Sequence, residues 1–93
     1  MIILLVGMIV KENKRDDFLK VTESLIKNTR LEKGNIDYNL YLDTESDNKY
    51  LMVENWKNDE CLCEHNQSTH FKNFVNESTN LLSEEIEIKK YEV

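Results

Sequence analysis

The chain has 93 residues with 12 basic and 18 acidic side chains, so its formal net charge is −6, and we expect residues 1–93 to form a single domain. The basic residues of this acidic chain are scattered and do not form a surface that attracts a phosphate backbone, which excludes a nucleic-acid partner. Proline is absent and only 2 residues are glycine, which excludes a disordered or linker-type chain.

The first ten residues, Met1 to Val10, are apolar apart from Gly7. This run is short and rich in β-branched residues, so residues 2–10 are predicted to form a strand that is buried on both faces. The run is much shorter than the roughly 20 apolar residues that span a bilayer, and it lacks the basic start of a signal peptide. We therefore expect no membrane association and a cytoplasmic location.

From Asn13 onward the apolar residues are spaced as on one side of a helix, with charged residues between them. The helix is predicted to end between Thr29 and Lys33, because Gly34 is a typical stop signal. Its apolar positions are Phe18, Val21, Leu25 and Ile26.

Residues 36–42 alternate between apolar and polar side chains, which is typical of a half-buried strand. A polar stretch over residues 43–48 predicts a loop, and residues 50–56 resume a strand, so the two strands form an antiparallel hairpin. The apolar positions of the first strand are Ile36, Tyr38, Leu40 and Leu42.

A second helical region is predicted to begin at Asn58 or Asp59, either of which can cap a helix, and to break near Ser68. Residues 85–93 predict a last strand, with a bulge where the apolar alternation changes phase between Ile88 and Tyr91. The inward positions of the helical region are Leu62, His65, Phe71, Phe74, Val75, Ser78, Leu81 and Leu82.

The element order βαββαβ predicts a ferredoxin-like α+β fold, with an antiparallel sheet and both helical regions on one face. The other face should be polar in a monomer, yet both sides of the strands at residues 2–10 and 50–56 carry apolar residues. A second copy of the same sheet is the simplest cover, so we expect a homodimer.

The chemistry-bearing residues concentrate between Glu54 and His70, a segment that holds the only tryptophan, Trp56, and both histidines. His65 is expected on the inward side of its helix, either as a hydrogen-bonded core residue or as a general base tuned by a carboxylate such as Glu54. Glu54 itself pairs with a lysine or backbone donor, or serves in catalysis. Trp56 either fills the core or forms one wall of an aromatic-ligand cavity.

Tyr38 and Tyr50 come from adjacent strands and could add hydroxyl donors to that cavity. His70 lies about 140° round a continuous helix from His65, so a shared metal would require the helix break, and we expect no metal site. Cys61 and Cys63 would point about 200° apart on a helix and are expected to be free thiols.

These residues resemble the antibiotic biosynthesis monooxygenase family of small dimeric α+β barrel proteins. The resemblance covers nearly the whole chain: the apolar start, the helix with Phe18, the turn at residues 32–35 leading to Tyr38, and above all residues 54–56 followed by Leu62, His65, residues 68–72 and Phe74. The paired histidines are most similar to the quinol monooxygenase-like and autoinducer-2-processing isomerase-like subgroups.

The resemblance implies a cavity between sheet and helices, with His65 as catalytic base, Glu54 as its orienting partner and Trp56 as a stacking wall. His70, Tyr38, Tyr50 and Met52 are the further candidates for substrate binding. Family members oxidise phenols or quinols with O2 and without metal or flavin, so we expect a small electron-rich aromatic substrate, O2 and no cofactor.

Two departures narrow this expectation. Members that oxidise aromatic polyketides tend to carry asparagine where this chain has Met52, which disfavours polyketide-type oxygen activation. Haem-degrading relatives carry an asparagine on the first strand and a tryptophan and a histidine in the second helical region. This chain has Gly7, His65 and Val75 at the nearest positions, which disfavours haem degradation. The alternatives are a non-enzymatic dimeric module that binds a small apolar ligand, and an isomerase of a small phosphorylated ketone, although no basic cluster is visible for a phosphate.

Overall fold

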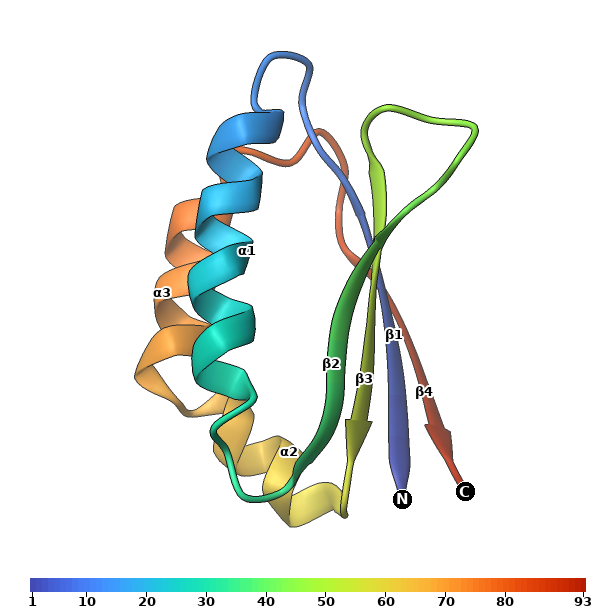
Figure 1. Ribbon diagram of the computed structural model, residues 1–93, viewed down its shortest axis with the longest axis vertical. Helices are drawn as coiled ribbons and strands as arrows, with labels where there is room; N and C mark the ends of the chain where they lie inside the picture. The colour runs from blue at the N-terminus through green and yellow to red at the C-terminus, as the bar shows by residue number, and fades with distance from the viewer.

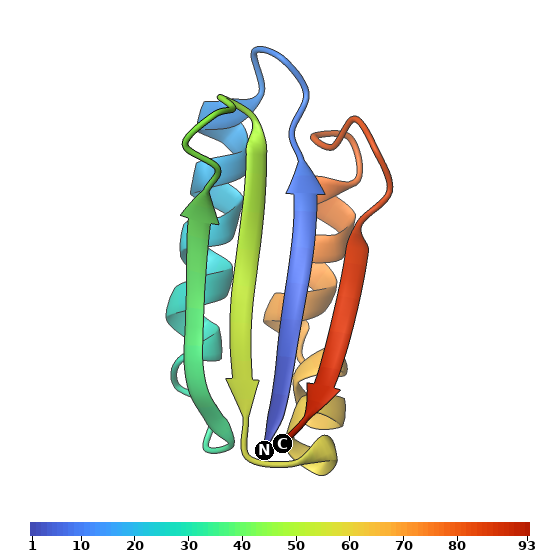
Figure 2. The same ribbon diagram turned by 90° about the vertical axis from the view of Figure 1, so that its right-hand side faces the viewer.

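The computed structural model describes residues 1–93 as one layer of helices packed on one antiparallel sheet (Figure 1). The sheet has the strand order β2-β3-β1-β4, and the chain termini lie side by side at one end of it (Figure 2). This arrangement confirms the predicted ferredoxin-like α+β fold. The elements are β1 (Ile2–Ile9), α1 (Arg15–Thr29), β2 (Asn35–Leu42), β3 (Lys49–Trp56), α2 (Asp59–Asn66), α3 (Thr69–Ser78) and β4 (Glu87–Glu92).

The core lies between the sheet and the helices. Alternate residues of β1 and β3 point into it, and burying one large apolar side chain of this kind stabilises the fold by about 1.5–3 kcal/mol. The buried hydrophobic residues are Ile2, Leu4, Met8, Val10, Phe18, Leu25, Tyr38, Tyr50, Met52, Trp56, Leu62, Phe74 and Leu81.

The second helical region breaks where the sequence predicts, and side-chain caps explain why. The Asn58 side chain accepts a hydrogen bond from the Cys61 backbone N–H at 3.0 Å and starts α2. Ser68 Oγ accepts from the Phe71 N–H at 3.2 Å and starts α3, while it donates to the His65 carbonyl at 2.6 Å. Ser68 therefore ends one helix and begins the next, which changes the directions of the side chains on either side of it.

Three local expectations are corrected. The β2–β3 register shifts between Asn35 and Asp37, so Ile36 is left 53% exposed and Tyr38 becomes the first buried residue of β2. The bulge predicted in the last strand is wrong, because the pairing of β4 with β1 is continuous and residues three apart on a regular strand already face opposite ways. Val75 is 44% exposed, since Phe74 and Ser78 take the inward positions of α3.

Gly34 lies in the turn between α1 and β2 and touches α2. A Cβ at this position would overlap both Sγ and Cβ of Cys61, and the Gly34 carbonyl accepts a hydrogen bond from the Lys57 N–H at 2.9 Å. The absence of a side chain therefore lets this turn lie directly against the first turn of α2.

Replacing Gly34 with alanine is expected to destabilise the protein by about 1–3 kcal/mol, because turn and helix must separate to admit the methyl group. Urea unfolding monitored by far-UV circular dichroism measures the difference. Lys33→Ala, at an exposed neighbouring position, is the control and should change stability little. Equal stability of Gly34→Ala and wild type would contradict the close contact.

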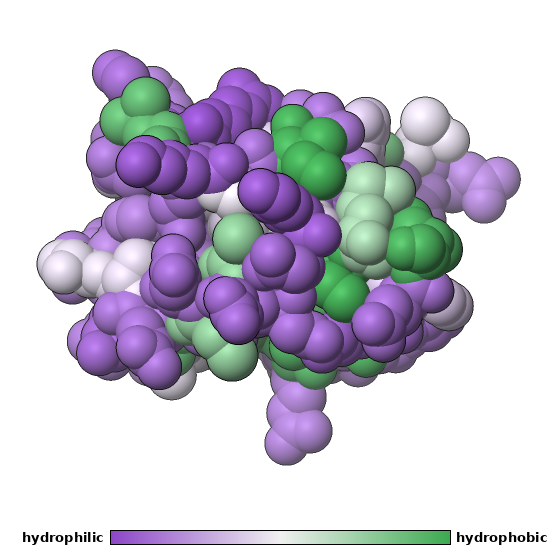
Figure 3. Space-filling model, turned by 90° about the horizontal axis from the view of Figure 1, so that it is seen from below, coloured by the Kyte–Doolittle hydropathy of each residue, from purple (hydrophilic) through white to green (hydrophobic).

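The sheet surface turned away from the helices, hereafter the open face, carries both apolar and polar side chains. Cross-strand partners share a face, and the pairs Ile3 with Tyr91, Leu5 with Val53, and Tyr41 with Leu51 all lie here. In the end-on view the hydrophobic surface concentrates on the side of the sheet (Figure 3). No helix covers this face of the chain (Figure 2).

Candidate functional site

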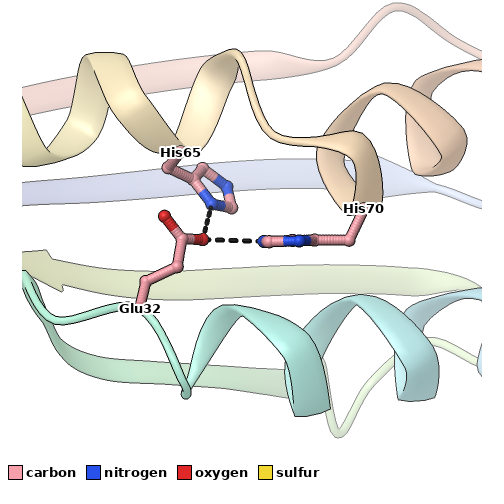
Figure 4. Close-up of side chains that lie close together, drawn as sticks. All are labelled: Glu32, His65 and His70. Carbon is pink, nitrogen blue, oxygen red and sulfur yellow. Dashed lines mark hydrogen bonds and ion pairs between the residues drawn. The ribbon is translucent and has the colours of Figure 1, made fainter.

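The two histidines converge on one carboxylate that comes from a third part of the chain. His65 Nδ1 lies 2.7 Å from Glu32 Oε2, and His70 Nε2 lies 2.8 Å from the same oxygen. Glu32 belongs to the turn after α1, His65 to the end of α2 and His70 to the start of α3 (Figure 4). The break at Ser68 makes this possible, since the two rings would point apart on one continuous helix.

The shared carboxylate determines which nitrogens carry protons. A carboxylate oxygen only accepts hydrogen bonds, so His65 Nδ1 and His70 Nε2 must both be N–H donors. In a neutral imidazole the other nitrogen is then an unprotonated acceptor. For His65 that nitrogen is Nε2, which is buried and has no hydrogen-bond partner.

His65 is enclosed by aromatic rings. The ring centroids of Trp56, Phe71 and Tyr38 lie 4.6, 5.0 and 5.6 Å from that of His65, and the His70 ring lies at 5.8 Å. His65 itself is 1% exposed. Burial lowers the pKa of His65 below its ordinary value, although the hydrogen bond and charge of Glu32 oppose this and raise it. The surroundings therefore favour a neutral imidazole with a free Nε2.

Glu54 is buried, but it is not the partner of His65 that the sequence suggested. Its Oε1 accepts a hydrogen bond from Trp56 Nε1 at 3.0 Å, and the carboxylate that holds His65 is Glu32. Burial raises the pKa of Glu54 to about 7, the Trp56 hydrogen bond lowers it, and the charge of Glu32 raises it. Glu54 orients the indole, and the indole packs on His65.

Tyr38 joins this group, and the structure shows what holds its strand in place. Its ring meets Trp56 edge-on with centroids 6.3 Å apart, and the Arg30 guanidinium donates two hydrogen bonds to the Tyr38 carbonyl at 2.9 and 3.1 Å. Burial, followed by the nearby charge of Glu54, raises the pKa of the Tyr38 hydroxyl. Tyr38 is therefore a neutral phenol at physiological pH.

Two of the candidate substrate-binding residues lie elsewhere. Tyr50 and Met52 face the core from β3, but they precede Trp56 by six and four residues, or about 20 and 13 Å along a strand. Tyr50 packs against Phe18 with ring centroids 5.0 Å apart. Tyr50 belongs to the core near the far end of β3 and Met52 to the core at its middle, because a strand separates residues along its axis even when they share a face.

The expected cavity between Trp56 and His65 is not among the five main pockets, none of which is lined by either residue. The two rings pack directly on each other instead. A groove of about 400 Å³ between α1 and α3 comes nearest to the site, since its lining includes His70 and Phe74. His70 is 21% exposed and thus connects the buried histidine with the solvent.

Glu32 is the functional candidate that reasoning from the sequence missed. It occurs in the turn before Gly34, where a charged residue looks like ordinary solvent-exposed loop. The available signals were its place two residues before a glycine that permits close packing and the inclusion of the turn at residues 32–35 in the family resemblance. With His65 and His70, Glu32 also supplies three potential metal-ligand atoms that lie within 4.8 Å of one another.

Comparison with known proteins agrees with this architecture. Residues 1–77 match the family model described as antibiotic biosynthesis monooxygenase. A Bacillus subtilis protein named "Putative monooxygenase YcnE" is 34% identical over 93 residues, which cover 100% of this chain and 98% of that protein.

Solved structures share this fold. A conserved protein from Methanosarcina mazei Go1 has 34% identity and a TM-score of 0.94, with 97% of this chain and 89% of that chain covered. A structure from Nitrosomonas europaea, described as a putative antibiotic biosynthesis monooxygenase, has a TM-score of 0.96 at 17% identity and covers 100% of this chain and 98% of that one, which shows the shared fold. From the family match and these relatives, the chain belongs to the antibiotic biosynthesis monooxygenase family.

Proposed function

We propose that this protein is a cofactor-independent monooxygenase that oxidises a small quinol or electron-rich phenol with O2. The observation that carries the proposal is His65 Nε2, a buried nitrogen without a partner whose lone pair is kept free because Glu32 holds the proton on Nδ1. A base in this state accepts a proton from a substrate hydroxyl, and Glu32 stabilises the imidazolium that forms. Names of relatives that contain the word monooxygenase support the same reaction class.

The reaction needs no external reductant. Once His65 has removed the hydroxyl proton, the quinol anion transfers an electron to O2, and the resulting radicals join to form a ring peroxide anion. His65 returns its proton to this anion, and the hydroperoxide then loses its OH group together with the ring hydrogen at that carbon as water, which leaves a hydroxyquinone. Quinol plus O2 thus gives hydroxyquinone plus water. A water-poor aromatic surrounding protects the anion from competing reactions.

The substrate route to His65 passes His70 and Phe71, the side chains beside it that are only partly buried. Tyr38 and Trp56 are buried, whereas His70 and Phe71 are half-buried. His70 also lines the groove between α1 and α3. We therefore assign His70 and Phe71 to the substrate entrance and Trp56 and Tyr38 to the closed wall.

Oxygen uptake with a panel of quinols tests the proposal. Turnover should incorporate one atom of labelled O2 into the product, with no added flavin or metal. If no quinol supports oxygen uptake and a His65 variant binds ligand as wild type does, the monooxygenase proposal is wrong and the protein is a non-enzymatic ligand-binding module.

Glu32→Gln isolates the positioning role of the carboxylate. We expect kcat to fall by about 10–100-fold with a smaller change in KM, because the neutral amide no longer favours the Nδ1–H form or stabilises the imidazolium. Nitrogen NMR of the imidazole should show a mixture of His65 tautomers in this variant and a single Nδ1–H form in wild type. A purely structural role for Glu32 predicts an unchanged tautomer.

One observation favours an isomerase as the second candidate. The groove at His70 is polar, and its lining includes Lys20, Ser24 and Asn28 beside the acidic Glu77. A polar ligand such as a phosphorylated ketone, held by Lys20, therefore suits this groove better than an apolar quinol. A His65 base would then move a proton between adjacent carbons with no uptake of O2. Product formation without oxygen consumption would identify this activity.

We also propose that two copies associate through the open face to form the dimeric barrel implied by the family resemblance. The open face has a depression of about 580 Å³ whose lining includes Leu5, Ile9, Tyr41 and Leu51 beside charged residues such as Lys49 and Glu87, and its apolar side chains would be buried against a second sheet.

Sedimentation equilibrium should give twice the chain mass of 11.1 kDa. Leu51→Glu, at a position 37% exposed in the single chain, should shift the protein toward monomer. Val75→Glu, on the helix side and 44% exposed, should leave the mass unchanged. A monomeric wild type at micromolar concentration would overturn the proposed dimer.

A further inference from the structure

The Glu32, His65 and His70 side chains have the composition of a transition-metal site. Two imidazole nitrogens and one carboxylate oxygen lie within 4.8 Å of one another, and this is one of the three-ligand sets that bind Zn²⁺ together with a water molecule. The sequence alone predicted no such site, because His65 and His70 converge only if the helix breaks between them and Glu32 was not among the candidate residues. The helix break and the separate origin of Glu32 remove that objection.

The three ligand atoms must rearrange to admit an ion. The two nitrogens lie 2.7 and 2.8 Å from Glu32 Oε2, whereas ligand atoms around tetrahedral Zn²⁺ with bonds of about 2.0–2.1 Å stand about 3.3 Å apart. Each nitrogen must therefore draw back from Oε2 by about half an ångström, and the two nitrogens, which lie within 4.8 Å of each other, must approach to about the same spacing, so that the ion lies between all three atoms. Glu32 can move this far because it comes from a turn and is 17% exposed.

The surroundings provide an entry path. His70 is 21% exposed and lines the groove between α1 and α3, so a hydrated ion can approach from that side and retain a water as fourth ligand. The net charge of −6 raises the local concentration of cations around the chain.

We propose that Glu32, His65 and His70 bind a divalent transition-metal ion such as Zn²⁺, and that the bound ion switches off His65 as a base. The metal takes the lone pair of Nδ1, and a neutral imidazole then carries its proton on Nε2. In His65, Nε2 is the nitrogen that the proposed function uses to accept the substrate proton. In His65 the proton moves through solvent from Nδ1 to Nε2. In His70 the metal binds Nε2, and the proton moves to Nδ1. Both rings stay neutral, so no net proton is taken up or released.

The proposed binding of the ion does not depend on the proposed function. The proposed loss of activity on ion binding does depend on that function. Calorimetric titration with Zn²⁺ alone tests binding without any turnover. We expect one ion per chain, with an association constant at least about 100-fold lower in Glu32→Gln and in His70→Ala, because each removes one of three protein ligands. Circular dichroism confirms that both variants are folded.

The thiols are the competing ligands, so the matched control removes them. Cys61 and Cys63 are both free, and Cys63 is exposed. The double variant Cys61→Ser/Cys63→Ser should keep the Zn²⁺ association constant of wild type. Binding that disappears in this variant, or that survives both Glu32→Gln and His70→Ala, would overturn the assignment.

Nitrogen NMR of the imidazoles tests the switch directly. The metal-free protein should show His65 protonated at Nδ1, and the Zn²⁺-saturated protein should show it protonated at Nε2. Oxygen uptake, where present, should fall in proportion to the occupied fraction and return when a chelator is added. A Zn²⁺ complex in which Nε2 stays unprotonated would overturn the proposed switch even if binding is tight.

Discussion

Replacing His65 with asparagine should lower the rate of quinol-dependent oxygen uptake by about 10²–10⁴-fold, which is the usual contribution of a positioned general base. Asparagine is the informative substitution because its amide N–H can replace Nδ1–H as a donor to Glu32, a contact that spans 2.7 Å in the protein. The variant thus keeps the hydrogen bond and removes only the nitrogen that lacks a partner. Steady-state kinetics with an oxygen electrode measure the effect on kcat and KM separately.

Cys63→Ser is the matched control for this variant, because Cys63 is exposed and lies on the same short helix. It should retain the wild-type rate. The role of His65 as base would be contradicted if His65→Asn kept more than about a tenth of the wild-type kcat, since a missing general base has a larger effect than that.

Replacing Glu54 with glutamine should change the pH dependence of stability. The pKa of Glu54 is about 7 in the folded protein against an ordinary value of 4.5, so the folded state binds the proton more tightly than the unfolded chain. The stability from this carboxyl is fully present below about pH 4.5 and is lost as the pH rises through 7. Above pH 7 the buried carboxylate lowers the free energy of unfolding by about 3 kcal/mol relative to acid conditions.

Glutamine cannot ionise, and its carbonyl oxygen can still accept the Trp56 N–H bond that Glu54 Oε1 accepts at 3.0 Å. Relative to wild type, the variant should therefore gain about 3 kcal/mol between pH 4.5 and pH 8. Urea unfolding at a series of pH values measures this difference. Glu23→Gln, at an exposed position of α1, should show a nearly constant difference from wild type. A constant difference for Glu54→Gln would show that the carboxyl titrates normally.

Local sequence patterns reveal Trp56, His65 and Glu54 as site residues, but they do not reveal Glu32. Trp56 and His65 stood out in the sequence because a rare aromatic at a strand end and an inward imidazole on a short helix are local features, and their rings do meet. The alternation of side chains along β3 places the Glu54 carboxylate on a buried face. It does not identify the hydrogen-bond partner of Glu54, which is the indole of Trp56 two residues later.

The sequence by itself determined the element order, the antiparallel ferredoxin-like sheet and the break at Ser68, because hydrophobic period and helix capping act over a few residues. Only the tertiary structure decided that Glu32 meets both histidines, since this contact joins residues 33 and 38 positions apart. It depends on a side-chain-free Gly34 packed against Cys61. Such long-range contacts arise from how the elements pack, and no short stretch of sequence encodes them.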